Sequence, residues 1–121
     1  MKKTIIVLFL FVSSFINAQD YKSIVAAADQ FYSDSNYVES AIKYQAAFKI
    51  EAKNPGDLYN GSCSAALAGK KDLAFEWLNL AFKNGWMNIK HLKTDTDLTS
   101  LHESKQWDEL LKEMQAAVDK K

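Results

Sequence analysis

Residues 40–48 read SAIKYQAAF, and residues 74–82 read AFEWLNLAF. The two stretches share few identities, but small and large side chains follow each other in the same register, and both end in Ala-Phe. They begin 34 residues apart, and self-similarity at an interval of this length is typical of proteins built from stacked structural units. The repeat therefore predicts that two similar units make up most of the fold.

The same interval relates residues on both sides of these stretches. Eight pairs of residues stand 34 positions apart along the two units, and all but the pair Phe31 and Ala65 keep the same size class. The pairs are Ile24 and Leu58, Ala27 and Gly61, Ala28 and Ser62, Phe31 and Ala65, Ser40 and Ala74, Tyr44 and Leu78, Ala47 and Ala81, and Phe48 and Phe82.

Each unit is expected to be a pair of helices. The repeated residues recur at i, i+3, i+4 and i+7, or at i, i+4, i+7 and i+8, which places them on one face of a helix. Turn-forming residues at 33–36 divide the first unit. In the second unit we expect helices at 58–68 and 72–83, joined by a turn at 69–71, with Pro55 at the helix start.

The small residues predict where two helices approach closely. Ala27 and Ala28 in the first unit, and Gly61 and Ser62 in the second, present little side chain. The large residues of the opposite helices are expected to pack toward them and to fill the seam between the units. These large residues are Tyr44, Leu78, Phe48 and Phe82.

This pattern resembles the tetratricopeptide repeat, a helix–turn–helix unit that stacks into a right-handed superhelix. The resemblance covers about residues 21–86, with one repeat at 21–54 and a second at 55–87. The chain departs from the family where Ala52 replaces the usual proline, and Pro55 follows three residues later. The resemblance implies an all-α, right-handed superhelical stack of antiparallel helix hairpins.

Residues 88–121 do not continue the repeat and are expected to form a divergent C-terminal capping segment. Short helices are expected at 88–92 and 97–101, and Ser104 is expected to cap a final helix. That helix carries an apolar stripe at Trp107, Leu110, Leu111, Met114 and Val118.

The first 18 residues have the layout of a secretory signal peptide, with Lys2 and Lys3 ahead of an apolar run and Ala18 before a possible cleavage point. The alternative is an uncleaved membrane anchor, but the apolar run is shorter than the roughly 20 residues that a membrane-spanning helix needs. We therefore expect an exported protein, periplasmic or secreted, with a single domain at 19–121 and no stable membrane span after cleavage.

Charge and cysteine content exclude several classes of protein. Acidic and basic residues balance at 15 each, and the sequence contains no Arg, which argues against a nucleic-acid-binding surface. Cys63 is the only cysteine, so an intramolecular disulfide is impossible, whereas an intermolecular one stays open. No catalytic motif or cofactor-binding motif is recognisable, and we expect neither an enzyme nor a bound cofactor.

Several residues are of types found in reactive or metal-binding sites, but structural roles explain them more simply. Cys63 is expected to be a helix-packing residue, because no group near it in sequence would lower its pKa. His91 and His102 lack the spacing of metal ligands, and residues 95–97 lack the remaining ligands of a calcium loop. We expect surface or capping roles for them, core positions for Trp86 and Trp107, and no metal site.

The resemblance also implies a binding groove on the concave face formed by the first helix of each repeat. The residues that it places there are Lys22, Val25, Asp29, Tyr32, Tyr59, Asn60, Cys63 and Ala66. Family members that grip a C-terminal carboxylate have Lys and Asn where this chain has Val25 and Asp29, so we do not expect that mode of binding. Tyr32 and Tyr59 instead fit contact with a protein or peptide.

Two functions are compatible with these features. The favoured one is an exported adaptor that binds a protein or peptide of unknown identity. The alternative is a structural module of the cell envelope that associates with another copy of itself. A small hydrolase or hydrolase inhibitor is a third, less favoured possibility.

Overall fold

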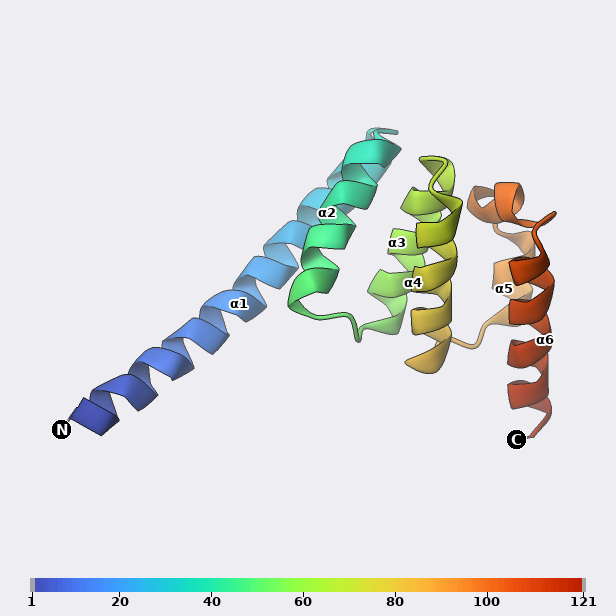
Figure 1. The fold of residues 1–121 in the computed structure, drawn as a ribbon. Helices are drawn as coiled ribbons and strands as arrows, with labels where there is room; N and C mark the ends of the chain where they lie inside the picture. The colour runs from blue at the N-terminus through green and yellow to red at the C-terminus, as the bar shows by residue number, and fades with distance from the viewer. Residues whose placement is uncertain (1, 121) are drawn as a thin grey trace.

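The computed structural model describes residues 2–120, with side chains from Asn17 onward. Throughout this part of the chain the regular secondary structure is helical, as the spacing predicted. The elements are α1 (Lys2–Ser33), α2 (Tyr37–Ile50), α3 (Pro55–Leu67), α4 (Lys71–Lys83), α5 (Ile89–Thr94), the 3₁₀ helix η1 (Thr96–Leu101) and α6 (Lys105–Asp119) (Figure 1).

The first four helices form two hairpins. α1 pairs with α2 and α3 pairs with α4, while α2 and α3 bring the two hairpins together (Figure 1). The turn of each hairpin contains one residue with positive φ, Ser35 at 59° and Gly69 at 79°. Both turns lie where the sequence places its turn-forming residues.

Asparagine side chains begin three of the helices. Asn36, Asn54 and Asn88 accept hydrogen bonds from the backbone N–H groups three residues on, which satisfies donors that a helix start leaves free. Ser104 also occupies an N-cap position, but its side chain makes no capping hydrogen bond. The expected N-cap position of Ser104 is therefore confirmed, but a capping hydrogen bond from its side chain is not formed.

The small repeated residues lie in the core, where helices meet closely. Ala28, Ala47, Ala74 and Ala81 are at most 1% exposed. Gly61 faces the ring of Phe48, and a Cβ added at Gly61 would come within 2.8 Å of that ring. The absence of a side chain at this position therefore allows the two hairpins to approach.

Aromatic rings fill the seam between the hairpins. Phe48 lies 5.7 Å from Tyr44 in a stacked arrangement and 4.9 Å from Trp77 edge to face, measured between ring centroids. Phe48 and Phe82 are half-buried and pack against the core. A buried polar contact, Ser40 Oγ to Ser64 Oγ at 2.8 Å, also joins α2 to α3.

The C-terminal segment covers the second hairpin. η1 contacts α3, and α6 contacts α4 and α5. Leu92, Leu98 and Leu101 are fully buried. On α6 the apolar stripe buries Trp107, Leu110 and Met114 and half-buries Leu111. Its last member departs from the expectation, since Val118 is 37% exposed near the end of the helix.

The N-terminal half of α1 extends beyond α2 and stands apart from the other helices (Figure 1). The expected signal peptide covers residues 1–18, most of which lie outside the residues whose side chains the structure describes. Among the described residues, no helix combines the length and apolar character needed to cross a membrane.

Candidate functional site

A cleft of about 580 Å³ opens between α1, α3 and the segment from α5 to η1. This volume lies within the range usual for ligand-binding pockets. We call it the tyrosine–aspartate cleft, and its lining consists of Asp29, Tyr32, Ser33, Tyr44, Tyr59, Asn60, Cys63, His91, Thr94, Asp95, Thr96 and Asp97.

Tyrosine hydroxyls hold the carboxylates of this cleft in place. Tyr59 on α3 donates to Asp95 Oδ2 at 2.6 Å, and Tyr32 on α1 donates to Asp97 Oδ2 at 2.5 Å. Tyr44 on α2 donates to Asp29 on α1. The bond of Tyr32 joins residues 65 positions apart and links the first hairpin directly to the C-terminal segment.

These tyrosines ionise less readily than a free tyrosine. Burial is the main cause of the raised pKa of Tyr44 and Tyr59, followed by the hydrogen bond to the aspartate. For Tyr32 the hydrogen bond to Asp97 is the main cause of the raised pKa. All three phenols therefore remain neutral hydrogen-bond donors at neutral pH.

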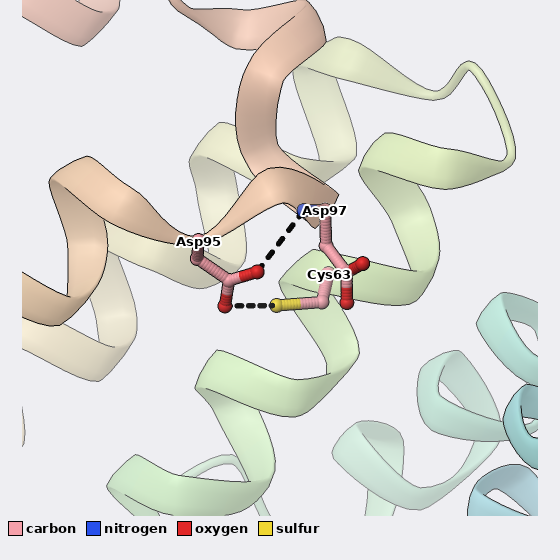
Figure 2. Close-up of side chains that lie close together, drawn as sticks. All are labelled: Cys63, Asp95 and Asp97. Atoms are coloured by element: carbon pink, nitrogen blue, oxygen red, sulfur yellow. Dashed lines mark hydrogen bonds between the residues drawn. The ribbon is translucent and has the colours of Figure 1, made fainter.

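Cys63 on α3 forms a cluster with Asp95 and Asp97 of the C-terminal segment (Figure 2), and all three line the cleft. Its Sγ atom lies 3.7 Å from Asp95 Oδ2, and Asp95 Oδ1 accepts a hydrogen bond from the backbone N–H of Asp97 at 3.0 Å. Asp95 thereby caps η1, which agrees with the capping role expected for residues 95–97.

The cluster has the residue types of a metal site, and its cysteine is a protonated thiol when no ion is bound. One ligand atom from each of Cys63, Asp95 and Asp97 lies within 4.8 Å of the others. Burial and the two carboxylates raise the pKa of the Cys63 thiol, whereas a metal ligand or nucleophile has to be a thiolate. The thiol is better suited to packing and to donating a weak hydrogen bond to Asp95.

Aromatic side chains support the outer wall of the cleft. The ring of Tyr59 stacks on Trp86 with 4.1 Å between centroids and 6° between planes. His91 lies 5.5 Å from the Tyr59 ring, and its Nε2 atom is 3.4 Å from Asp95 Oδ2. These contacts restrict Tyr59, so the hydroxyl that orients Asp95 is itself well positioned.

The cleft carries unbalanced negative charge. Asp29, Asp95 and Asp97 line it, and no Lys does. Among the described residues, the contact of His91 Nε2 with Asp95 is the only candidate ion pair, and it is one only when the imidazole is protonated. A ligand that enters the cleft therefore meets carboxylates that no described ammonium group neutralises.

Five of the eight groove residues expected from the sequence line this cleft: Asp29, Tyr32, Tyr59, Asn60 and Cys63. The other three lie elsewhere. Lys22 lines a separate cleft between the middle of α1, the end of α2 and the start of α3, Val25 is half-buried against the core, and Ala66 is only 4% exposed.

The cleft residues that the sequence did not predict are Tyr44, His91, Thr94, Asp95, Thr96 and Asp97. The sequence predicts that Tyr44 packs between helices. Tyr44 does so, since it is 1% exposed, and its hydroxyl also donates to Asp29 in the cleft. The others belong to the C-terminal segment, which has no repeat pattern to place it. The capping character of the residues at 95–97 was the one available signal.

Comparison with known proteins gives no relative. No family model matches the chain, and no curated protein or solved structure matches it either.

Proposed function

We propose that this chain is an exported adaptor, a short stack of tetratricopeptide-type helix hairpins that binds a protein or peptide in the tyrosine–aspartate cleft. The observation that carries the proposal is the cleft itself, which lies over α1 and α3. These are the first helices of the two hairpins, and the resemblance assigns the binding groove to the same helices.

The side chains of the cleft suit recognition of a partner. Tyrosine offers a flat apolar ring and one polar end, and it loses little conformational freedom on binding. Here Tyr32 and Tyr59 are already held by Asp97 and Asp95. Such preorganisation lowers the entropic cost of association.

The chemistry of the cleft favours binding over catalysis. The side chain in its lining with the highest intrinsic nucleophilicity is Cys63, whose pKa is raised by burial. The protonated thiol is a poor nucleophile, and His91 contacts Asp95 rather than Cys63 in the described contacts. We therefore propose a binding protein and not an enzyme.

Site-specific photo-crosslinking tests the adaptor proposal. Asn60 is exposed and lines the cleft, so a benzoylphenylalanine placed there faces any bound partner. Glu113 on α6 is exposed and outside the cleft, which makes it the matched control. We expect a discrete adduct with one envelope protein from position 60 only. Equal adducts from both positions, or none from position 60, would reject the proposal.

Self-association is the second candidate, because α2 carries an exposed apolar stripe. Val38, Ile42 and Ile50 are 49%, 43% and 42% exposed and lie at i, i+4 and i+12 on one helix face. Sedimentation equilibrium tests this candidate. A dimer that dissociates when Ile42 is changed to Asp would support it, and a monomer at every concentration would reject it.

A further inference from the structure

We propose that the tyrosine–aspartate cleft selects a positively charged peptide segment, with a Lys ammonium or Arg guanidinium group seated against Asp97. This inference rests on the proposed function, because it specifies the partner of the same cleft. It specifies that the partner carries positive charge, and it names the residues that recognise this charge.

The charge of the cleft is local and is not a property of the whole chain. The sequence has equal numbers of acidic and basic residues, yet three carboxylates and no Lys line this cleft. A concave surface with charges of one sign concentrates the electrostatic potential and attracts ligands of the opposite sign. A basic segment therefore complements the cleft, and an acidic segment is repelled.

The carboxylates retain room for a new donor. The hydroxyl of Tyr32 donates a hydrogen bond to Asp97 Oδ2, and the hydroxyl of Tyr44 donates one to Asp29 Oδ1. Among the described contacts, no donor reaches Asp97 Oδ1 or Asp29 Oδ2. An ionised carboxylate accepts several hydrogen bonds, and an ammonium or guanidinium group supplies three or five donors. A basic side chain thus binds without breaking the tyrosine bonds.

Tyrosine rings provide a surface for the apolar part of a basic side chain. Tyr32 is 38% exposed at the mouth of the cleft, and its hydroxyl is fixed on Asp97. Lys and Arg commonly lay their methylene groups along apolar surface while the charged end reaches a carboxylate. Their cations also interact favourably with the faces of aromatic rings.

A metal ion fits the same residues less well. Coordination would remove the proton of Cys63, which now donates to Asp95. It would also compete with the hydroxyl of Tyr59 for Asp95 Oδ2. A basic side chain requires neither change, so the existing hydrogen bonds favour an organic cation.

The test uses three blocked octapeptides, in which Ala alternates with Lys, with Gln or with Glu. Chemical-shift perturbation in ¹H–¹⁵N spectra of the chain from Gln19 to Lys121 reports both affinity and location. We expect the Lys peptide to shift the amides of Tyr32, Asn60 and Asp97. We expect the Glu peptide to leave them unchanged, and raised salt to weaken binding of the Lys peptide.

Matched variants separate the cleft charge from the total charge. In Asp97→Asn, the amide oxygen still accepts from Tyr32, while one negative charge is lost. Glu113→Gln removes the same single charge at an exposed position on α6. We expect at least a tenfold weaker affinity for the Lys peptide in the first variant and less than a twofold change in the second.

The outcomes distinguish this inference from the proposed function. Equal binding of the Gln and Lys peptides in the cleft would overturn cation selection but leave peptide binding intact. If none of the three peptides shifts the cleft amides, and position 60 gives no adduct, both fall. Saturable binding of ZnCl₂ at Cys63 and Asp95, with no response to the Lys peptide, would overturn the inference in favour of a metal site.

Discussion

At the scale of single residues, one interaction recurs among the described residues: a tyrosine hydroxyl donates a hydrogen bond to an aspartate carboxylate on another element. Besides the three pairs of the cleft, Tyr21 on α1 donates to Asp57 on α3 at 2.6 Å. Hydrogen bonds to a charged acceptor are stronger than those between neutral groups. Tyrosine–aspartate pairs therefore fasten α1 to the second hairpin and to the C-terminal segment.

These pairs predict a loss of stability at alkaline pH. The pKa values of Tyr21, Tyr32, Tyr44 and Tyr59 are raised in the folded chain. Their contribution to the free energy of unfolding is complete below the unfolded-state pKa of about 10. It is lost as pH rises above that value, because the unfolded chain releases its phenolic protons first.

Absorbance at 295 nm and circular dichroism during the same pH titration measure this loss. We expect most phenols to ionise together with unfolding, at a pH above that seen for the chain in denaturant. Replacing Tyr37 by Phe should leave the transition in place, because this tyrosine has no aspartate partner among the described hydrogen bonds. Ionisation of all tyrosines near pH 10 with helicity retained would contradict the prediction.

Gly61 supplies the second prediction at this scale. A Cβ at Gly61 would lie 2.8 Å from Phe48 and 3.2 Å from Trp77, whereas a Cβ at Gly56 meets only Asn54, at 3.4 Å. Both glycines lie in α3, so an Ala at either site brings a similar gain in helix propensity of up to about 1 kcal/mol. Overpacking of an aromatic seam costs about 1–3 kcal/mol.

Gly61→Ala should therefore be less stable than Gly56→Ala by about 1–3 kcal/mol in urea unfolding. The comparison isolates packing, since propensity changes in the same direction in both variants. Equal stabilities would mean that the ring of Phe48 moves aside freely and that the seam is loosely packed.

At the scale of elements, the helix boundaries were the most predictable feature. Residues at i, i+3 and i+4 define a face without any knowledge of the partner helix, and Asn, Gly and Pro mark ends through local geometry. The expected second hairpin at 58–68 and 72–83 corresponds to α3 and α4. The capping hydrogen bond of Ser104 is not formed, because residue type alone does not determine whether a side chain meets the backbone N–H groups.

The start of α4 offers a test of capping. Lys70 occupies the N-cap position and makes no capping hydrogen bond, unlike Asn36, Asn54 and Asn88. A lysine there also places positive charge at the positive end of the helix dipole. Lys70→Asn should therefore stabilise the chain by about 0.5–1 kcal/mol.

Lys71→Asn is the matched control, since it removes the same charge one position into the helix without supplying a cap. Thermal unfolding followed by circular dichroism should show a higher midpoint for Lys70→Asn only. An equal rise in both variants would assign the effect to charge and not to the cap.

At the scale of the whole molecule, the sequence indicated which helices exist but only partly which residues meet. The cleft brings α1, α3 and the C-terminal segment together, and Tyr32 reaches Asp97 across 65 residues. No local pattern encodes such a contact, because the C-terminal segment lacks the repeat that relates the two hairpins. Sequence reasoning therefore found the half of the cleft that lies on α1 and α3 and missed the half contributed by residues 91–97.

The last prediction concerns where the stable fold begins. The first described hydrogen bond of α1 to the second hairpin is made by Tyr21; further along α1, Ala28 lies in the core and Val25 packs against it. Gln19 and Asp20 are exposed. A chain that starts at Gln19, the expected cleavage point, should therefore keep the unfolding midpoint of the full-length chain.

A chain that starts at Ala26 is the matched comparison, because it loses Tyr21 and Val25 but keeps Ala28. Loss of a hydrogen bond to a charged group costs about 1.5–3 kcal/mol, which in a domain of this size lowers the midpoint by roughly 10 °C. We expect this drop for the chain from Ala26 and no drop for the chain from Gln19. A midpoint that falls already in the chain from Gln19 would show that residues before it stabilise the fold.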